Sequence, residues 1–123
     1  MAEGEERELE EQLGRRNYAA AVALAQRLEK PPETIRGLQE AAIKQYITEY
    51  RNAPGAMALL GQFRFTAQEL ERLLNAILQE AGRAGQERTS WAKKRYDAKA
   101  MKYLDIEEWI SQYGAALKRA ASP

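Results

Sequence analysis

The chain of 123 residues contains neither cysteine nor histidine. Without cysteine, disulfides, thiolate nucleophiles and cysteine-based zinc sites are excluded. Without histidine, the Ser-His and Cys-His nucleophile pairs, an imidazole general base and the usual zinc and iron ligands are excluded as well. Paired glutamates could still support catalysis, but no two form a recognisable motif. We therefore expect no enzyme activity, no catalytic residue, no cofactor and no metal.

Long apolar segments are also absent. No run approaches the roughly 20 apolar residues that a membrane-spanning helix needs. The N-terminus is acidic, whereas a signal peptide is basic and then apolar. We therefore expect no membrane association and a cytoplasmic location.

The composition is that of a folded globular protein. Hydrophobic residues make up 45% and charged residues 30% of the chain, and 123 residues fit one domain, residues 1–123. The net charge is only +1, but the charges are segregated. Residues 1–13 carry six Glu against Arg7, and residues 83–103 carry seven Lys or Arg against Glu87 and Asp97.

Apolar residues recur at helical spacing over most of the chain. The sequence therefore predicts an all-α fold, a single-domain bundle of about five helices. Helices over 32–51, 66–82 and 105–119 should form the core, with shorter helices over 17–29 and 55–61 closing it. Residues 1–13 have few apolar anchors and are expected to be a frayed acidic segment, and residues 82–90 a loop or linker.

Two helix starts carry a local signature. Thr66 is followed three residues later by Glu69, and Asp105 by Glu108. In each pair the two side chains can accept hydrogen bonds from each other's backbone N–H groups, which is a capping box. The sequence therefore predicts helix starts at residues 66 and 105.

Residues 91–103 are basic and aromatic, with Tyr96 and Tyr103 among the cations. Their pattern fits either a short helix or a hairpin. A contact surface for an anion or a partner would use Trp91, Lys93, Lys94, Arg95, Lys99 and Lys102. In the simpler alternative, which we favour, the rings point inward and the lysines are solvated.

Residues 22–38 resemble a helix-turn-helix DNA-binding motif through Val22, Ala25, Leu28 and Ile35. The resemblance implies a recognition helix beginning near Pro32. That helix would present Glu33 and Glu40 to DNA phosphates, which repel them. Two packed helices explain the same apolar positions.

Residues 97–108 resemble an EF-hand calcium loop, with acids at Asp97, Asp105 and Glu108. The motif needs oxygen ligands and a glycine between these acids, where this chain has Lys99 and Lys102. A capping box at residue 105 accounts for the acids without calcium, so we predict no metal here.

These exclusions leave a non-catalytic role. We expect a helical protein–protein interaction or scaffold module that binds another protein through an apolar patch involving Tyr50, Met57, Phe63 or Trp91. The alternative is a nucleic-acid-binding protein that uses residues 91–103 or the motif at 22–38. The sequence leaves the oligomeric state and the helix order open.

Overall fold

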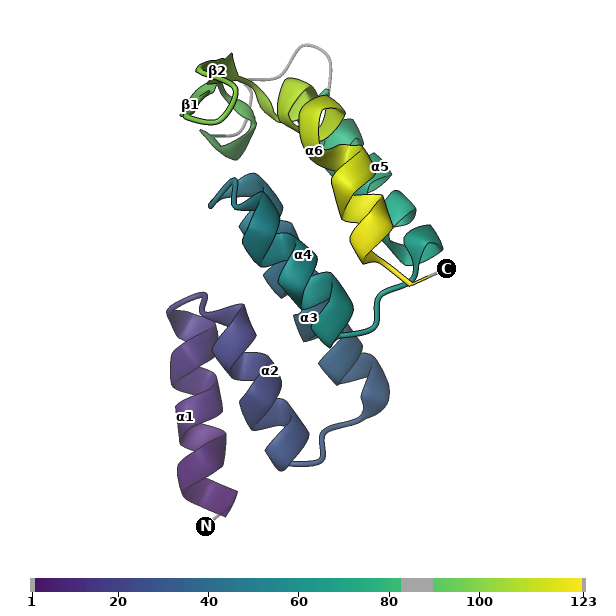
Figure 1. Ribbon diagram of the computed structural model, residues 1–123. Helices are drawn as coiled ribbons and strands as arrows, with labels where there is room; N and C mark the ends of the chain where they lie inside the picture. The colour runs from purple at the N-terminus through teal and green to yellow at the C-terminus, as the bar shows by residue number, and fades with distance from the viewer. Residues whose placement is uncertain (1, 83–89, 123) are drawn as a thin grey trace. The chain divides into compact units, whose positions relative to one another are not determined.

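A computed structural model describes the backbone of residues 2–82 and 90–122. Within these ranges the fold contains six α-helices and one small sheet of two strands, which confirms the all-α class (Figure 1). The predicted loop over 82–90 lies almost wholly outside the described residues. The helices are α1 (Ala2–Gly14), α2 (Tyr18–Arg27), α3 (Pro32–Thr48), α4 (Ala53–Gln62), α5 (Ala67–Ala81) and α6 (Ile106–Ala120).

Internal contacts divide the chain into two compact units, residues 1–43 and 44–123. The boundary falls inside α3, so this helix contributes to both. The prediction of a single domain over residues 1–123 stays a prediction.

The first unit is built on the packing of α1 against α2. Buried Leu9, Ala21 and Leu24 form a hydrophobic cluster, with Leu13, Leu28 and Leu38 packed against it. Two ion pairs connect α1 to the end of α2 and to the residues after it: Arg27 Nε lies 3.5 Å from Glu5 Oε2, and Lys30 Nζ lies 2.6 Å from Glu6 Oε1.

Residues 2–14 form the helix α1, and the prediction that this N-terminal segment is frayed stays a prediction. Two leucines, Leu9 and Leu13, and two ion pairs hold α1 against its neighbour. The two leucines are visible in the sequence. Pairing of the glutamates with Arg27 and Lys30 is not, because it depends on how α1 packs against α2.

The second unit is organised around α6, which packs against both α4 and α5. The apolar residues that recur at helical spacing along α5 and α6 are buried, except Leu78 and Tyr113, which are half-buried. Two backbone hydrogen bonds attach Ser122 to the start of α5: Ala67 N donates to Ser122 O (2.7 Å), and Ser122 N donates to Phe65 O (2.7 Å).

Helix α4 has a larger role than the sequence predicted. It was expected to close the core as a short accessory piece. Four of its ten residues, Ala53, Ala56, Leu59 and Leu60, are instead buried. Small side chains at two of these positions permit the close approach of α6.

Both capping boxes are present. Thr66 N donates to Glu69 Oε1 (3.0 Å) while Glu69 N donates to Thr66 Oγ1 (3.1 Å). Asp105 N donates to Glu108 Oε1 (3.1 Å) while Glu108 N donates to Asp105 Oδ1 (2.8 Å). Both predicted helix starts are confirmed.

Candidate binding site

The basic and aromatic segment folds mainly as a hairpin. After a short 3₁₀ helix, η1 (Ser90–Ala92), strand β1 (Arg95–Asp97) pairs antiparallel with β2 (Lys102–Leu104). The register places Arg95 opposite Leu104, Tyr96 opposite Tyr103, and Asp97 opposite Lys102. Of the two alternatives that the sequence left open, the hairpin is correct for residues 95–104.

The two faces of the hairpin differ because side chains alternate along a strand. On the inner face Leu104 is buried. On the outer face Tyr96 and Tyr103 are 56% and 62% exposed, and their ring centroids lie 5.3 Å apart at an interplanar angle of 69°. The simpler alternative, in which these rings point inward, is therefore wrong for both tyrosines.

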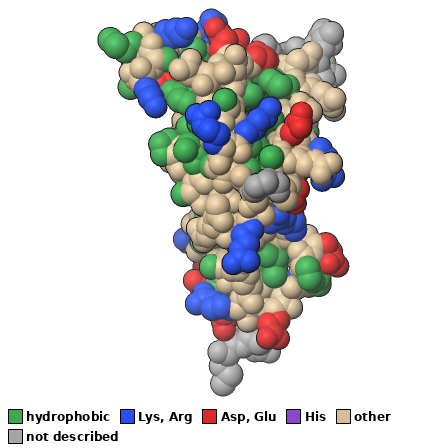
Figure 2. Space-filling view, turned by 45° about the vertical axis from the view of Figure 1, so that its right-hand side comes forward, with side chains coloured by type: hydrophobic (Ala, Val, Ile, Leu, Met, Phe, Trp, Pro, Cys, Tyr) green, Lys and Arg blue, Asp and Glu red, His purple; other side chains and the backbone are tan. Residues whose placement is uncertain are grey.

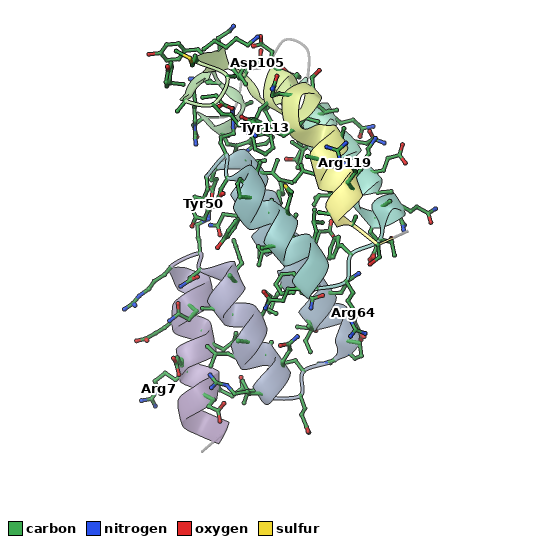
Figure 3. The ribbon with its side chains drawn as sticks, in the orientation of Figure 1. Arg7, Tyr50, Arg64, Asp105, Tyr113 and Arg119 are labelled. Carbon is green, nitrogen blue, oxygen red and sulfur yellow. The ribbon has the colours of Figure 1, made fainter. Side chains whose placement is uncertain are left out.

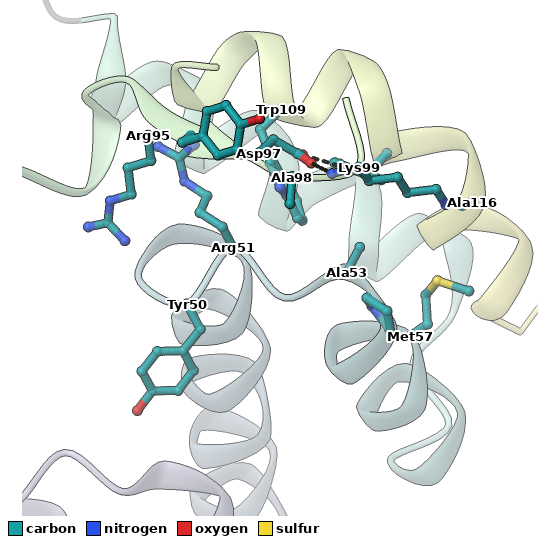
Figure 4. Close-up of a pocket in the computed structure, with 13 residues that line it drawn as sticks. Tyr50, Arg51, Ala53, Met57, Arg95, Asp97, Ala98, Lys99, Trp109 and Ala116 are labelled. Atoms are coloured by element: carbon teal, nitrogen blue, oxygen red, sulfur yellow. Dashed lines mark hydrogen bonds between the residues drawn. The ribbon is translucent and has the colours of Figure 1, made fainter. Parts of the chain in front are cut away.

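Arg51 fastens the hairpin segment to the end of α3. Its guanidinium donates to the carbonyl oxygens of Leu104 (3.0 Å), Trp91 (2.8 Å) and Lys93 (2.9 Å). Figure 4 shows this side chain extending toward the hairpin, while the ring of Tyr50 points the other way. Arg51 has a positive φ of 49°, a conformation that a helix cannot continue through, and α3 ends at Thr48, three residues before the predicted end.

A second arginine lies close by. Arg95 Nη1 donates to the carbonyl oxygen of Glu49. Burial lowers the pKa of Arg51, and the positive charge of Arg95 lowers that pKa further, whereas Asp105 and Glu107 raise it by smaller amounts. The hydrogen-bond acceptors of both guanidinium groups are neutral carbonyls, so these contacts do not cancel either charge.

Asp97 connects the hairpin to α6. Its Oδ2 accepts a hydrogen bond of 2.5 Å from the hydroxyl of Tyr113, which Figure 3 labels on α6. Its Oδ1 accepts from the backbone N–H groups of Lys99 (2.9 Å) and Ala100 (3.1 Å) in the hairpin turn. The bond from Tyr113 lowers the pKa of Asp97, and burial together with the carboxylate raises the pKa of Tyr113 to about 12.

These elements enclose a pocket of about 500 Å³, which we call the hairpin pocket (Figure 4). Its walls come from the start of α4, from β1 with its turn, and from α6. Apolar and aromatic groups dominate the lining. The lining residues are Tyr50, Arg51, Ala53, Pro54, Met57, Arg95, Tyr96, Asp97, Ala98, Lys99, Trp109, Tyr113 and Ala116.

The structure brings together only some of the residues predicted for the site. Arg95 and Lys99 line the pocket. Trp91 is half-buried beside it, where its carbonyl serves Arg51. The remaining predicted lysines, Lys93, Lys94 and Lys102, are exposed, and Lys94 Nζ lies 3.3 Å from Glu108 Oε1.

Sequence analysis missed the contributions of α4 and α6. Arg51 contacts carbonyls 40 to 53 residues away, and Tyr113 contacts a carboxylate 16 residues away. No local pattern marks either side chain, because both contacts depend on tertiary packing. The unusual run after α3, Asn52 with Pro54 and Gly55, indicated a helix end but no site.

Among the described residues, three of the four large exposed apolar side chains lie on the hairpin, and the ring of the fourth, Tyr50, points away from it (Figure 4). The four are Tyr50, Tyr96, Met101 and Tyr103. Figure 2 shows apolar and cationic side chains next to each other at the top of the view, where Figure 1 draws the hairpin. Of the predicted patch, Tyr50 is exposed and Met57 lines the pocket, but Phe63 is only 8% exposed, so its inclusion was wrong.

The acids of the calcium-loop resemblance have other structural roles. Asp97 caps the hairpin turn, and Asp105 and Glu108 form a capping box. In the described part of the chain no three acidic side chains are grouped closely enough to hold a metal ion.

The helix-turn-helix resemblance falls on α2 and the start of α3. Val22 and Ala25 are buried, and Leu28 packs in the cluster of the first unit. Glu33 and Glu40 are exposed on α3. This surface would repel phosphate, as the sequence indicated.

The fold and the site define an all-α protein with an aromatic pocket closed on one side by a short hairpin. Comparison with protein-family models, with curated proteins and with solved structures finds no match to the chain. Among the helices described, none is long and apolar enough to cross a membrane.

Proposed function

We propose that this chain is a non-catalytic interaction module that binds another protein through the hairpin pocket. The observation that carries the proposal is the coincidence of the pocket with exposed large apolar side chains. Tyr96 belongs to both, and Met101 and Tyr103 extend the apolar surface along the hairpin, whereas the exposed ring of Tyr50, another lining residue, points away from the hairpin. Solvent-exposed apolar groups concentrated at one place are typical of protein-binding surfaces.

The pocket also has the size and composition of a ligand site. Its volume of about 500 Å³ lies within the roughly 300 to 1,000 Å³ of binding pockets, which are mainly apolar with a few convergent polar groups. Aromatic side chains and arginine, which make up six of the thirteen lining residues, are enriched at the energetic centres of protein interfaces.

Site-specific photo-crosslinking tests the proposal. A photoreactive phenylalanine analogue replaces Ala98, an exposed residue of the pocket lining, and in the control it replaces Ala115, an exposed residue of α6 outside the lining. After irradiation in cells, we expect a discrete protein adduct from position 98 that resists nuclease and is absent from position 115. Equal adducts from both positions would contradict a pocket-directed interaction.

A second candidate function, binding of single-stranded nucleic acid, is favoured by the outer face of the hairpin. Tyr96 and Tyr103 offer exposed rings for base stacking, and Lys93 and Lys94 are exposed in the segment just before β1. This candidate predicts an affinity for oligonucleotides that falls steeply with salt. Charge reversal at Lys93, Lys94 and Lys102 would abolish oligonucleotide binding. In the crosslinking experiment, an adduct from position 98 would disappear on nuclease treatment if nucleic acid were the ligand.

A further inference from the structure

The lining of the hairpin pocket carries an uneven charge. Arg51, Arg95 and Lys99 contribute three cations, against the carboxylate of Asp97. Charge complementarity at a binding surface selects partners of the opposite sign. An anionic group brought to this lining would meet more positive than negative charge.

The carboxylate of Asp97 offsets one of these three positive charges, which leaves two in excess, and it is already engaged by three hydrogen bonds. One oxygen accepts from Tyr113, and the other accepts from the backbone of Lys99 and Ala100. A cationic ligand would have to displace these hydrogen bonds before it could pair with Asp97.

The two arginines strengthen the preference for an anion. Each is fixed by carbonyl oxygens, Arg51 by those of Trp91, Lys93 and Leu104, and Arg95 by that of Glu49. Guanidinium groups held in place by other contacts lose little side-chain freedom when an anion binds nearby. Their mutual repulsion, which contributes to the lowered pKa of Arg51, would be relieved by a carboxylate.

The floor of the pocket, in contrast, is apolar. Trp109 is 2% exposed, and Ala53, Met57 and Ala116 complete the surface between α4 and α6. A large apolar side chain can displace water from this floor at about 25 cal/mol per Å² of apolar area buried. The pocket therefore combines an apolar interior with cationic walls.

We infer that the hairpin pocket binds an acidic linear segment of a partner protein, with one large apolar side chain inserted between α4 and α6 and flanking carboxylates facing Arg51, Arg95 and Lys99. This inference rests on the proposed function. A macromolecular ligand fits better than a small metabolite, because Tyr103 and Met101 continue the exposed apolar surface beyond the pocket. Exposed Lys93 and Lys102 extend the positive charge in the same region.

Fluorescence anisotropy with labelled peptides and the intact chain tests this inference. The probe is a peptide with a central Trp flanked by Asp and Glu. Matched peptides replace the Trp by Ala, or the acids by Gln. We expect the acidic Trp peptide to bind at least about tenfold more tightly than either control, because each control removes one of the two recognition elements.

Two pairs of variants localise the binding. Lys99→Glu should weaken it about fivefold through lost charge attraction, whereas Lys118→Glu, the same change at an exposed lysine near the end of α6, should leave it unchanged. Ala98→Asp should weaken binding because it adds a negative charge to the pocket lining, and Ala115→Asp, outside the lining, should not. Both Ala98 and Lys99 are exposed in a turn, so the variants should fold, which circular dichroism verifies.

The alternative occupants are outcomes of the same experiment. Equal binding of the acidic and Gln-flanked peptides overturns the charge inference. Tighter binding of an oligo-dT probe overturns it in favour of nucleic acid. Tightest binding of a peptide of residues 2–14, which is acidic and carries Leu9 and Leu13, overturns the inference in favour of a second copy of this chain. Failure of every peptide, together with a protein crosslink from position 98, overturns the inference but leaves the proposed function standing.

Discussion

The hydrogen bond between Tyr113 and Asp97 ties α6 to the hairpin through two side chains whose pKa values shift in opposite directions. The lowered pKa of Asp97 means that its stabilising effect is present above its ordinary pKa and is lost as the pH falls through the folded-state value. The raised pKa of Tyr113 means that its effect is present below pH 10 and is lost as the pH rises toward about 12.

Tyr113→Phe should therefore lower the free energy of unfolding by about 1 kcal/mol at neutral pH, the typical net value of a hydrogen bond. Urea unfolding of the two proteins measures the difference. It should shrink in strong acid, where Asp97 is protonated in both the native and the unfolded state. A difference that stays constant from neutral pH into strong acid would show that the hydroxyl of Tyr113 stabilises the protein without needing an ionised Asp97.

Arg51 is the residue on which the position of the hairpin depends most. Arg51→Lys keeps the positive charge but cannot reproduce a planar fork that reaches three carbonyls. We expect the free energy of unfolding to fall by about 2 kcal/mol. Arg72→Lys, at an exposed site on α5, should change it by less than about 0.5 kcal/mol. Equal denaturation midpoints for both variants would refute this role.

At the scale of the elements, α4 contains two glycines in different surroundings. A Cβ added at Gly55 would come within 2.8 Å of the ring of Tyr46 and 2.5 Å of Asn52 Nδ2, whereas one added at Gly61 meets nothing within 4 Å. Close contact of Gly55 with the Tyr46 ring explains why the residue after Pro54 is glycine.

Gly55→Ala should therefore destabilise the protein by about 1 to 2 kcal/mol through overpacking, although alanine is the better helix former. Gly61→Ala, in the same helix, should stabilise it by up to about 1 kcal/mol. Thermal unfolding should move the two melting temperatures in opposite directions. Stabilisation by both substitutions would show that the Tyr46 ring yields without cost.

Local signals and tertiary contacts explain which elements the sequence could predict. The starts of α5 and α6 were predictable because Thr66 and Asp105 each find their capping partner three residues away. The hairpin was ambiguous because its pairing is supported by Arg51, 40 or more residues distant. The pocket was invisible for the same reason, since its lining comes from three separate segments.

On the scale of the whole molecule, charge is divided between the two compact units. Residues 1–43 carry nine Glu against six Lys or Arg, and residues 44–123 carry nine acidic against thirteen basic residues, so their net charges are −3 and +4. The overall value of +1 therefore conceals a basic unit, and the hairpin pocket belongs to that unit.

Stability should also be distributed unevenly. Among the described side chains of α1 only Leu9 is buried, whereas α5 buries five residues. Helices held by few apolar contacts open at lower free energy. We expect native-state hydrogen exchange to be fastest in α1 and slowest in α5 and α6. Equal protection of α1 and α5 would mean that the chain opens only as one cooperative unit.

The two tryptophans of the chain can report directly whether the acidic Trp peptide binds in the hairpin pocket. Trp109 forms part of the pocket lining, and Trp91 does not. The acidic Trp peptide is titrated into the labelled protein and NMR spectra are recorded. We expect the indole N–H signal of Trp109 to move, together with the amide signals of Ala98, Lys99 and Ala116. The indole signal of Trp91 should move much less. Binding that leaves the Trp109 signal in place, and instead shifts amides of α2 and α3, would contradict the hairpin pocket as the binding site.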